Sequence, residues 1–170
     1  MYNIRGKILV DGSVTRLQYH KYKPFGQPAF APNDYISLVI LSENTYLLPS
    51  VSRLCIERRL LNAEGQGKSS DTELTKNCAL YLFSDIQYRL NNQIIDHVRN
   101  PGIATLMKGY VSFTACEANA LQNAGWGTID DLKKLVDGDG RFNFCIPLKM
   151  ILGFAEDYKK NTLNSVINWS

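Results

Sequence analysis

The feature that most constrains this chain is a hairpin signal between residues 79 and 98. Residues 79–90 and 93–98 are strand-like, and the pair Asn91-Asn92 separates them. Asparagine tolerates the positive φ angles that a tight hairpin turn requires at its two central positions. The hairpin predicts an antiparallel sheet, and such a sheet needs a second layer to bury its apolar face.

Several other segments have the composition or the alternation of short strands. We expect them at residues 15–22, 35–41, 45–48, 51–61 and 141–146. In residues 51–61 the even-numbered side chains, including Leu54 and Ile56, are expected to face the core. Phe142, Phe144 and Ile146 share one side of residues 141–146.

A helical insertion interrupts this strand pattern at residues 101–125. Asn100 is expected to cap a helix that has Pro101 at its first position. Thr114 and Glu117 have the spacing of a capping box, which predicts a second helix that ends at Gly125. Four apolar residues of the first helix recur at helical spacing: Ile103, Leu106, Met107 and Tyr110. Residues 128–136 are expected to form a third short helix.

The length and composition indicate one domain with a substantial core. The chain has 170 residues, of which 45% are apolar and 21% are charged. We expect an all-β fold, a jelly-roll or two-sheet antiparallel sandwich with the helical insertion. The expected parts are an N-terminal arm (1–13), a barrel (14–160) and a C-terminal tail (161–170).

The charge and hydropathy of the chain argue against several classes of partner. A net charge of +3 is low for a protein that coats nucleic acid. No apolar run approaches the roughly 20 residues of a membrane helix. The N-terminus lacks the apolar segment of a signal peptide. We therefore expect neither nucleic-acid nor membrane binding, and a location in the cell interior or a virion.

No residue set predicts catalysis, a cofactor or a metal site. The four cysteines, at positions 55, 78, 116 and 145, form no CxxC pair and have apolar neighbours, so we expect buried thiols. The two histidines, His20 and His97, are too few for a cupin-type metal site. A Cys–His nucleophilic pair stays open as an alternative, because such pairs form in space rather than along the chain.

Two loops resemble ligand-binding motifs without matching them. Residues 64–69 end like a phosphate-binding loop, but Asn62 stands where the first glycine is required. Residues 137–139 open like a calcium loop, but Phe142 occupies the position that needs glycine. We expect a solvated loop and a turn, respectively.

Three stretches together resemble a known family. They are residues 46–57, residues 79–103 and residues 142–160. They are similar to double jelly-roll-like proteins of insect genomes and of polinton-like or adinto-like viruses. The resemblance covers about residues 15–160, and residues 142–160 are its most specific part.

The resemblance implies a capsid role and transfers no catalytic residue. Double jelly-roll coat proteins place two barrels side by side, and this chain has the length of one. It implies a virion structural protein, or a genome-integrated relative, that associates with itself as a trimer or pentamer, or with other capsid proteins. The expected contact surfaces are residues 25–34, 63–77 and 101–125. The alternative is a non-enzymatic binding module for a glycan or a protein, because jelly rolls also occur in lectins.

Overall fold

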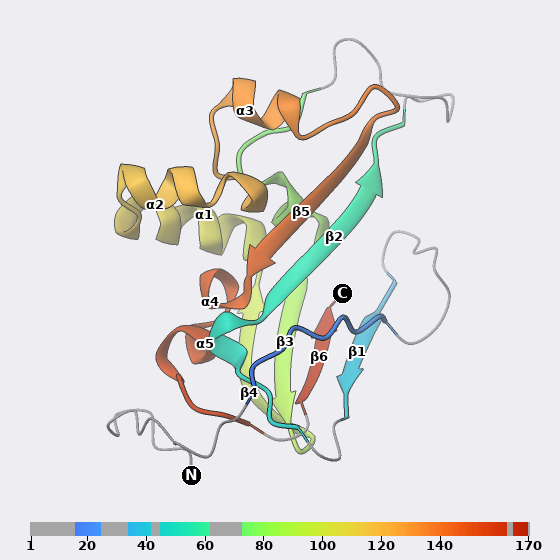
Figure 1. The fold of residues 1–170 in the computed structure, drawn as a ribbon, viewed down its shortest axis with the longest axis vertical. Helices are drawn as coiled ribbons and strands as arrows, with labels where there is room; N and C mark the ends of the chain where they lie inside the picture. Colours follow the sequence, from blue (N-terminus) through green and yellow to red (C-terminus); the bar gives the residue numbers. More distant parts are fainter. Residues whose placement is uncertain (1–15, 25–33, 42–44, 62–72, 163–164, 170) are drawn as a thin grey trace.

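The computed structural model describes residues 16–24, 34–41, 45–61, 73–162 and 165–169. Within these residues, strands form two antiparallel sheets (Figure 1). One sheet has the strand order β1-β6-β3-β4, and the other consists of β2 and β5. The strands are β1 (Ile36–Ile40), β2 (Arg53–Arg59), β3 (Asp85–Leu90), β4 (Gln93–Arg99), β5 (Arg141–Pro147) and β6 (Ser165–Trp169).

Both sheets bury side chains in one hydrophobic core. β3 contributes every second residue, and Ile86 and Tyr88 are completely buried. β2 contributes Leu54 and Ile56, as the alternation predicted, whereas Arg58 is exposed near the end of the strand. β5 contributes Phe142, Phe144 and Ile146, which confirms the predicted inward face. The period-two pattern therefore orients both strands of the smaller sheet.

The predicted hairpin forms, but its first half is shorter than expected. Asn91 and Asn92 have φ angles of 47° and 66° and connect β3 to β4. Residues 79–82, predicted as strand, belong instead to the 3-10 helix η2 (Cys78–Leu82). Ala79 and Leu80 are buried there, so their apolar side chains fill the core without a sheet partner.

In the described residues, five short α-helices and two further 3-10 helices accompany the sheets. They are η1 (Pro49–Val51), α1 (Pro101–Ser112), α2 (Ala115–Ala120), η3 (Gln122–Ala124), α3 (Ile129–Lys134), α4 (Leu148–Ile151) and α5 (Gly153–Asp157). The helical insertion is confirmed. Figure 1 shows α1 and α2 to one side of β5. These helices make the purely all-β description too simple for the described residues, whereas the antiparallel sheets agree with it.

The capping box predicted for Thr114 and Glu117 is present at the start of α2. The Thr114 hydroxyl accepts a hydrogen bond from the Glu117 backbone N–H, and the Glu117 carboxylate accepts one from the Thr114 backbone N–H. That backbone bond, followed by the bond from the Thr114 hydroxyl, lowers the pKa of Glu117. Thr128 and Asp131 form the same box at α3. The expected side-chain cap at Asn100 is wrong, because Asn100 has a φ of 48° and makes no such bond.

The ends of the expected barrel differ from the prediction. Residues 16–24 form no strand, and Leu17 and Tyr19 are largely exposed. Their alternation is compatible with a strand, but a strand needs a neighbour with which to share hydrogen bonds. Within residues 45–48, Leu47 makes an isolated bridge to Thr162. The expected N-terminal arm lies outside the described residues.

The expected C-terminal tail contains a strand of the larger sheet. β6 pairs with β1 on one side and with β3 on the other. Its pairing with β3 places Ile167 opposite Tyr88, the buried residue at the middle of that strand. The expectation that residues 161–170 form a tail is therefore corrected, because residues 165–169 form an internal strand of this sheet.

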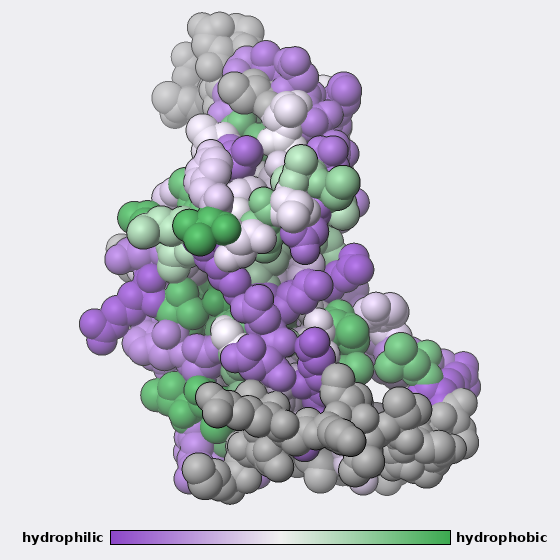
Figure 2. Space-filling model, turned by 90° about the vertical axis from the view of Figure 1, so that its left-hand side faces the viewer, coloured by the Kyte–Doolittle hydropathy of each residue, from purple (hydrophilic) through white to green (hydrophobic). Residues whose placement is uncertain are grey.

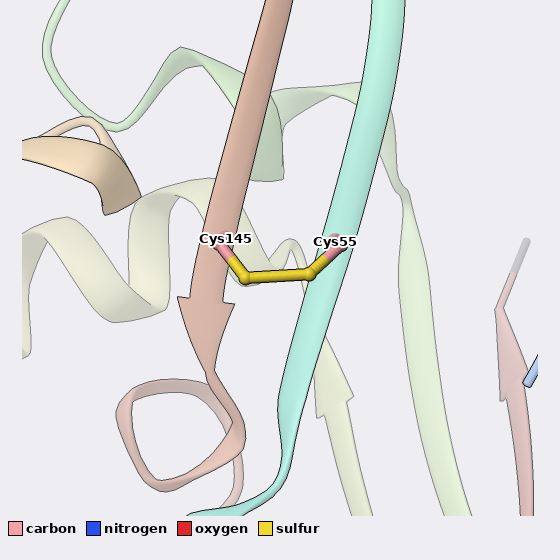
Figure 3. The surroundings of a disulfide bond; sticks show 2 residues. All are labelled: Cys55 and Cys145. Atoms are coloured by element: carbon pink, nitrogen blue, oxygen red, sulfur yellow. A yellow bond between two sulfur atoms is a disulfide. The ribbon is translucent and has the colours of Figure 1, made fainter. Parts of the chain in front are cut away.

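A disulfide joins β2 to β5 (Figure 3). Cys55 and Cys145 are directly opposite in the strand register, with 4.3 Å between their Cα atoms. The expectation of four buried thiols is wrong: Cys55 and Cys116 are exposed, and Cys78 and Cys145 are half-buried. The alternation of β2 was a usable signal, because it places Cys55 on the face opposite Leu54 and Ile56.

Breaking this disulfide is expected to destabilise the fold. The bridge spans 90 residues, and closing a loop of that length removes unfolded-chain entropy worth about 4–5 kcal/mol. Urea unfolding should show a lower free energy of unfolding for Cys55→Ser/Cys145→Ser, and dithiothreitol should lower that of the native chain equally. Cys116→Ser is the matched control and should leave it unchanged. Equal unfolding midpoints for the native chain and the double variant would contradict this assignment.

Candidate interaction surface

Helix α1 turns both of its glycines toward the core. Pro101, Gly102, Thr105 and Gly109 are its buried residues. A Cβ atom on Gly102 would lie 2.6 Å from the Tyr81 ring, and one on Gly109 would collide with the Trp126 ring. The helix therefore approaches the core closely through residues that carry little side chain.

A buried asparagine fixes this approach. Asn77 is fully buried with a φ of 61°, and its side-chain amide donates hydrogen bonds to the Gly102 carbonyl (2.9 Å) and the Thr105 hydroxyl (2.7 Å). Its backbone N–H donates to the Gly125 carbonyl at 2.8 Å. Asn77 belongs to residues 63–77, which were expected to form a contact surface. Instead it links η2 to the first turns of α1 and to the end of the helical insertion.

The large apolar residues of α1 face solvent. Ile103, Met107, Tyr110 and Val111 are exposed by 52%, 66%, 67% and 89%. Together with the half-exposed Tyr81 they form what we call the α1 patch. Figure 2 shows apolar residues gathered in patches on this side of the molecule, with hydrophilic residues between them. Three of the four residues that the helical spacing singled out thus lie outside the core, and Leu106 is half-buried.

Neighbouring elements make specific contacts with α1 around the patch. A small pocket at its edge is lined by Tyr81, Phe83, Asn100, Gly102 and Ile103. The Trp126 ring packs edge-on against Phe113, with 5.1 Å between ring centroids, and against Tyr110 at 6.1 Å. Lys108 donates to the Glu156 carboxylate of α5 and to the Lys149 carbonyl of α4. Contacts from η2, α4 and α5 therefore hold α1 in place.

The described residues offer no assembled catalytic or metal centre. His97 Nε2 lies 2.6 Å from Asp85 Oδ2, and the neighbouring Asp96 carboxylate accepts from the His97 backbone N–H, not from its ring. His20 is exposed within residues 16–24, which form no strand. Burial raises the pKa of the Cys78 thiol, which keeps it protonated near neutral pH and weakens it as a nucleophile. Among these residues, no three His, Cys, Asp or Glu side chains gather where they could hold a metal ion.

The structure bears on the three expected contact surfaces to different extents. The helical insertion 101–125 is described, and it carries the α1 patch. Residues 25–33 and 62–72, which include the phosphate-loop-like stretch 64–69, lie outside the described residues. Residues 137–140 form the expected turn, closed by a bond from the Gly140 N–H to the Asp137 carbonyl. In the part of the chain that is described, no helix has the length and apolar character to cross a membrane.

Comparison with known protein families decides the family of this chain. Residues 72–168 match the model of the double jelly roll-like domain. The chain belongs to this family. The family match indicates a fold of the viral capsid type, and members of the family are typically structural rather than catalytic. Neither a curated protein nor a solved structure matches the chain.

The matched region contains most of the larger sheet and the whole α1 patch. It runs from just before η2 to within β6, and thus includes the stretch from residue 161 onward that was expected to be a tail. The family resemblance read from residues 79–103 and 142–160 is confirmed. The match begins after β2, so β1 and β2 lie outside it.

Removing the Asn77 amide is expected to destabilise the fold. Asn77→Ala loses two buried hydrogen bonds and puts alanine, which tolerates a positive φ less well than asparagine, in a left-handed conformation, so the free energy of unfolding should fall by about 3 kcal/mol. Asn77→Gly keeps the conformational freedom and loses only the amide, so about 2 kcal/mol is expected. Chemical unfolding followed by circular dichroism measures both. A change below 0.5 kcal/mol, within the range of a surface substitution, would argue against this role.

Proposed function

We propose that this protein is a capsid-type structural subunit, from a virion or from a genome-integrated viral relative, that acts by self-association. Membership of the double jelly roll-like family supports the structural role. The α1 patch supports the association, because a rigid helix presents large apolar side chains to water. It also lies in the helical insertion, which the sequence indicated as a contact surface.

The energetic argument rests on how the patch is built. Burying one fully exposed Val, Ile or Met side chain contributes about 1.5–3 kcal/mol. Ile103, Met107 and Val111 are each more than half exposed, so a partner that covers all three gains several such contributions. In a closed symmetric assembly the same contact repeats in every subunit. Weak individual contacts therefore suffice for a stable shell, without a cofactor.

The described strands do not favour the alternative of a glycan-binding module. Glycan recognition on a jelly roll would be supported by exposed aromatic residues on a sheet face. The exposed tyrosines that the structure describes are Tyr19, Tyr35, Tyr46, Tyr81 and Tyr110. All five lie outside the strands. Tyr88, which does lie in a strand, is completely buried.

Charging the α1 patch is expected to weaken self-association. Light scattering after gel filtration, over a concentration series, should give an oligomeric mass such as a trimer or pentamer for the native chain. Met107→Lys/Val111→Lys introduces two charges that a partner would have to desolvate. The variant should dissociate at concentrations at least tenfold higher than those at which the native chain does. Circular dichroism should show an unchanged fold, since both residues are exposed.

The matched control adds charge far from the patch. Gln93 is exposed at the tip of the β3–β4 hairpin, and Gln93→Lys should leave the mass unchanged. A native chain that stays monomeric at every concentration would overturn the proposal of self-association. An oligomer that the double lysine variant leaves intact would show instead that another surface makes the contact.

A further inference from the structure

Strand β2 has a main-chain edge directed away from β5. The Leu60 N–H donates to the Gly140 carbonyl and the Leu148 N–H donates to the Ser52 carbonyl, so even-numbered residues of this strand pair with β5. Hydrogen bonding alternates along an antiparallel strand. The main-chain groups of the odd-numbered residues, from Arg53 to Arg59, therefore point outward.

No described strand occupies this edge. β2 pairs only with β5 in its sheet (Figure 1). Among the described residues, the one contact to these outward main-chain groups is the Arg58 side chain, which donates to the Glu57 carbonyl at 3.0 Å. An exposed row of unpaired N–H and C=O groups can accept a further strand. The structure therefore provides a template seven residues long.

The side chains along the edge specify which strand fits. Arg53 and Glu57 are exposed on the same face and make no ion pair with the described residues. They are four residues apart in an extended strand, roughly 13 Å, which is too far for them to pair with each other. Arg59 is already engaged, because its Nε donates to the Asp139 carbonyl at 2.8 Å. Arg53 and Glu57 thus present one cation and one anion along this edge at a fixed spacing.

A second copy of β2 has the complementary charges. In an antiparallel pair centred on Cys55, Arg53 of each chain lies opposite Glu57 of the other. Opposite charges at directly facing positions stabilise a strand pair. A partner shifted by two residues would place Arg53 against Arg59 or against Cys55, which loses both charge pairs. The charge pattern therefore favours one register.

We infer that two copies of this chain pair through the outer edge of β2, antiparallel and centred on Cys55, with reciprocal Arg53–Glu57 ion pairs. The two small sheets then form one continuous sheet across a two-fold axis. Each Cys55 keeps its disulfide to Cys145, because the new contact uses the main chain in the plane of the sheet whereas the side chains leave that plane. This inference rests on the proposed self-association and names a contact for it.

Charge reversal with mixing tests the register directly. Arg53→Glu places two glutamates opposite each other in the dimer, and Glu57→Arg does the same with two arginines. Each variant alone should dimerise at least tenfold more weakly than the native chain in sedimentation velocity. An equimolar mixture should form a heterodimer, because each strand then meets the opposite charge. The variant Arg53→Glu/Glu57→Arg should regain the native dissociation constant.

The controls separate this contact from the α1 patch and from misfolding. Lys159→Glu reverses an exposed charge that does not belong to β2, and this variant should dimerise normally. Rescue by mixing excludes misfolding as the cause of a defect. If the native chain associates but charge reversal has no effect, or mixing restores nothing, the β2 contact is wrong and the proposed function stands. If the native chain is monomeric throughout, both fail.

Discussion

The side-chain amide of Asn77 joins parts of the chain that are far apart in sequence. It is buried without exposure to water, and it satisfies the Gly102 carbonyl and the Thr105 hydroxyl of α1. Its backbone N–H binds the Gly125 carbonyl at the end of the same insertion. Buried polar groups are costly unless paired, so the two hydrogen bonds that the Asn77 amide donates stabilise this placement of α1. The glycines at 102 and 109 then make close contact with the aromatic rings of Tyr81 and Trp126 possible.

That placement explains the character of the surface. Because the small face of α1 is used for packing, Ile103, Met107 and Val111 have no room in the core and face solvent. The smaller sheet leaves a second opportunity for contact, since β2 has a partner on one side only. The exposed face of α1 would be stabilised by burial of apolar side chains. The edge of β2 would be stabilised by main-chain hydrogen bonds and charge pairs. Membership of the double jelly roll-like family agrees with a structural role for such contacts.

Local sequence patterns correctly predicted the elements that are stabilised by interactions between residues close in sequence. The Asn91-Asn92 turn, the capping box at Thr114, and the inward faces of β2 and β5 depend on neighbours a few residues away. The failures depend on distant partners. Residues 79–82 look like a strand, yet they fill the core as a 3-10 helix. Residues 15–22 have strand alternation, but their described part, from residue 16, has no sheet partner among the described residues.

By itself, the sequence determined the hairpin, the insertion and the family, because spacing and residue type express these directly. Only the tertiary structure decided which side of α1 is buried, because apolar periodicity marks a face without saying what lies against it. It also decided that Cys55 meets Cys145 and that β6 lies between β1 and β3. These pairings join residues on different strands, and the free energy of such contacts depends on the register of the whole sheet rather than on any local pattern.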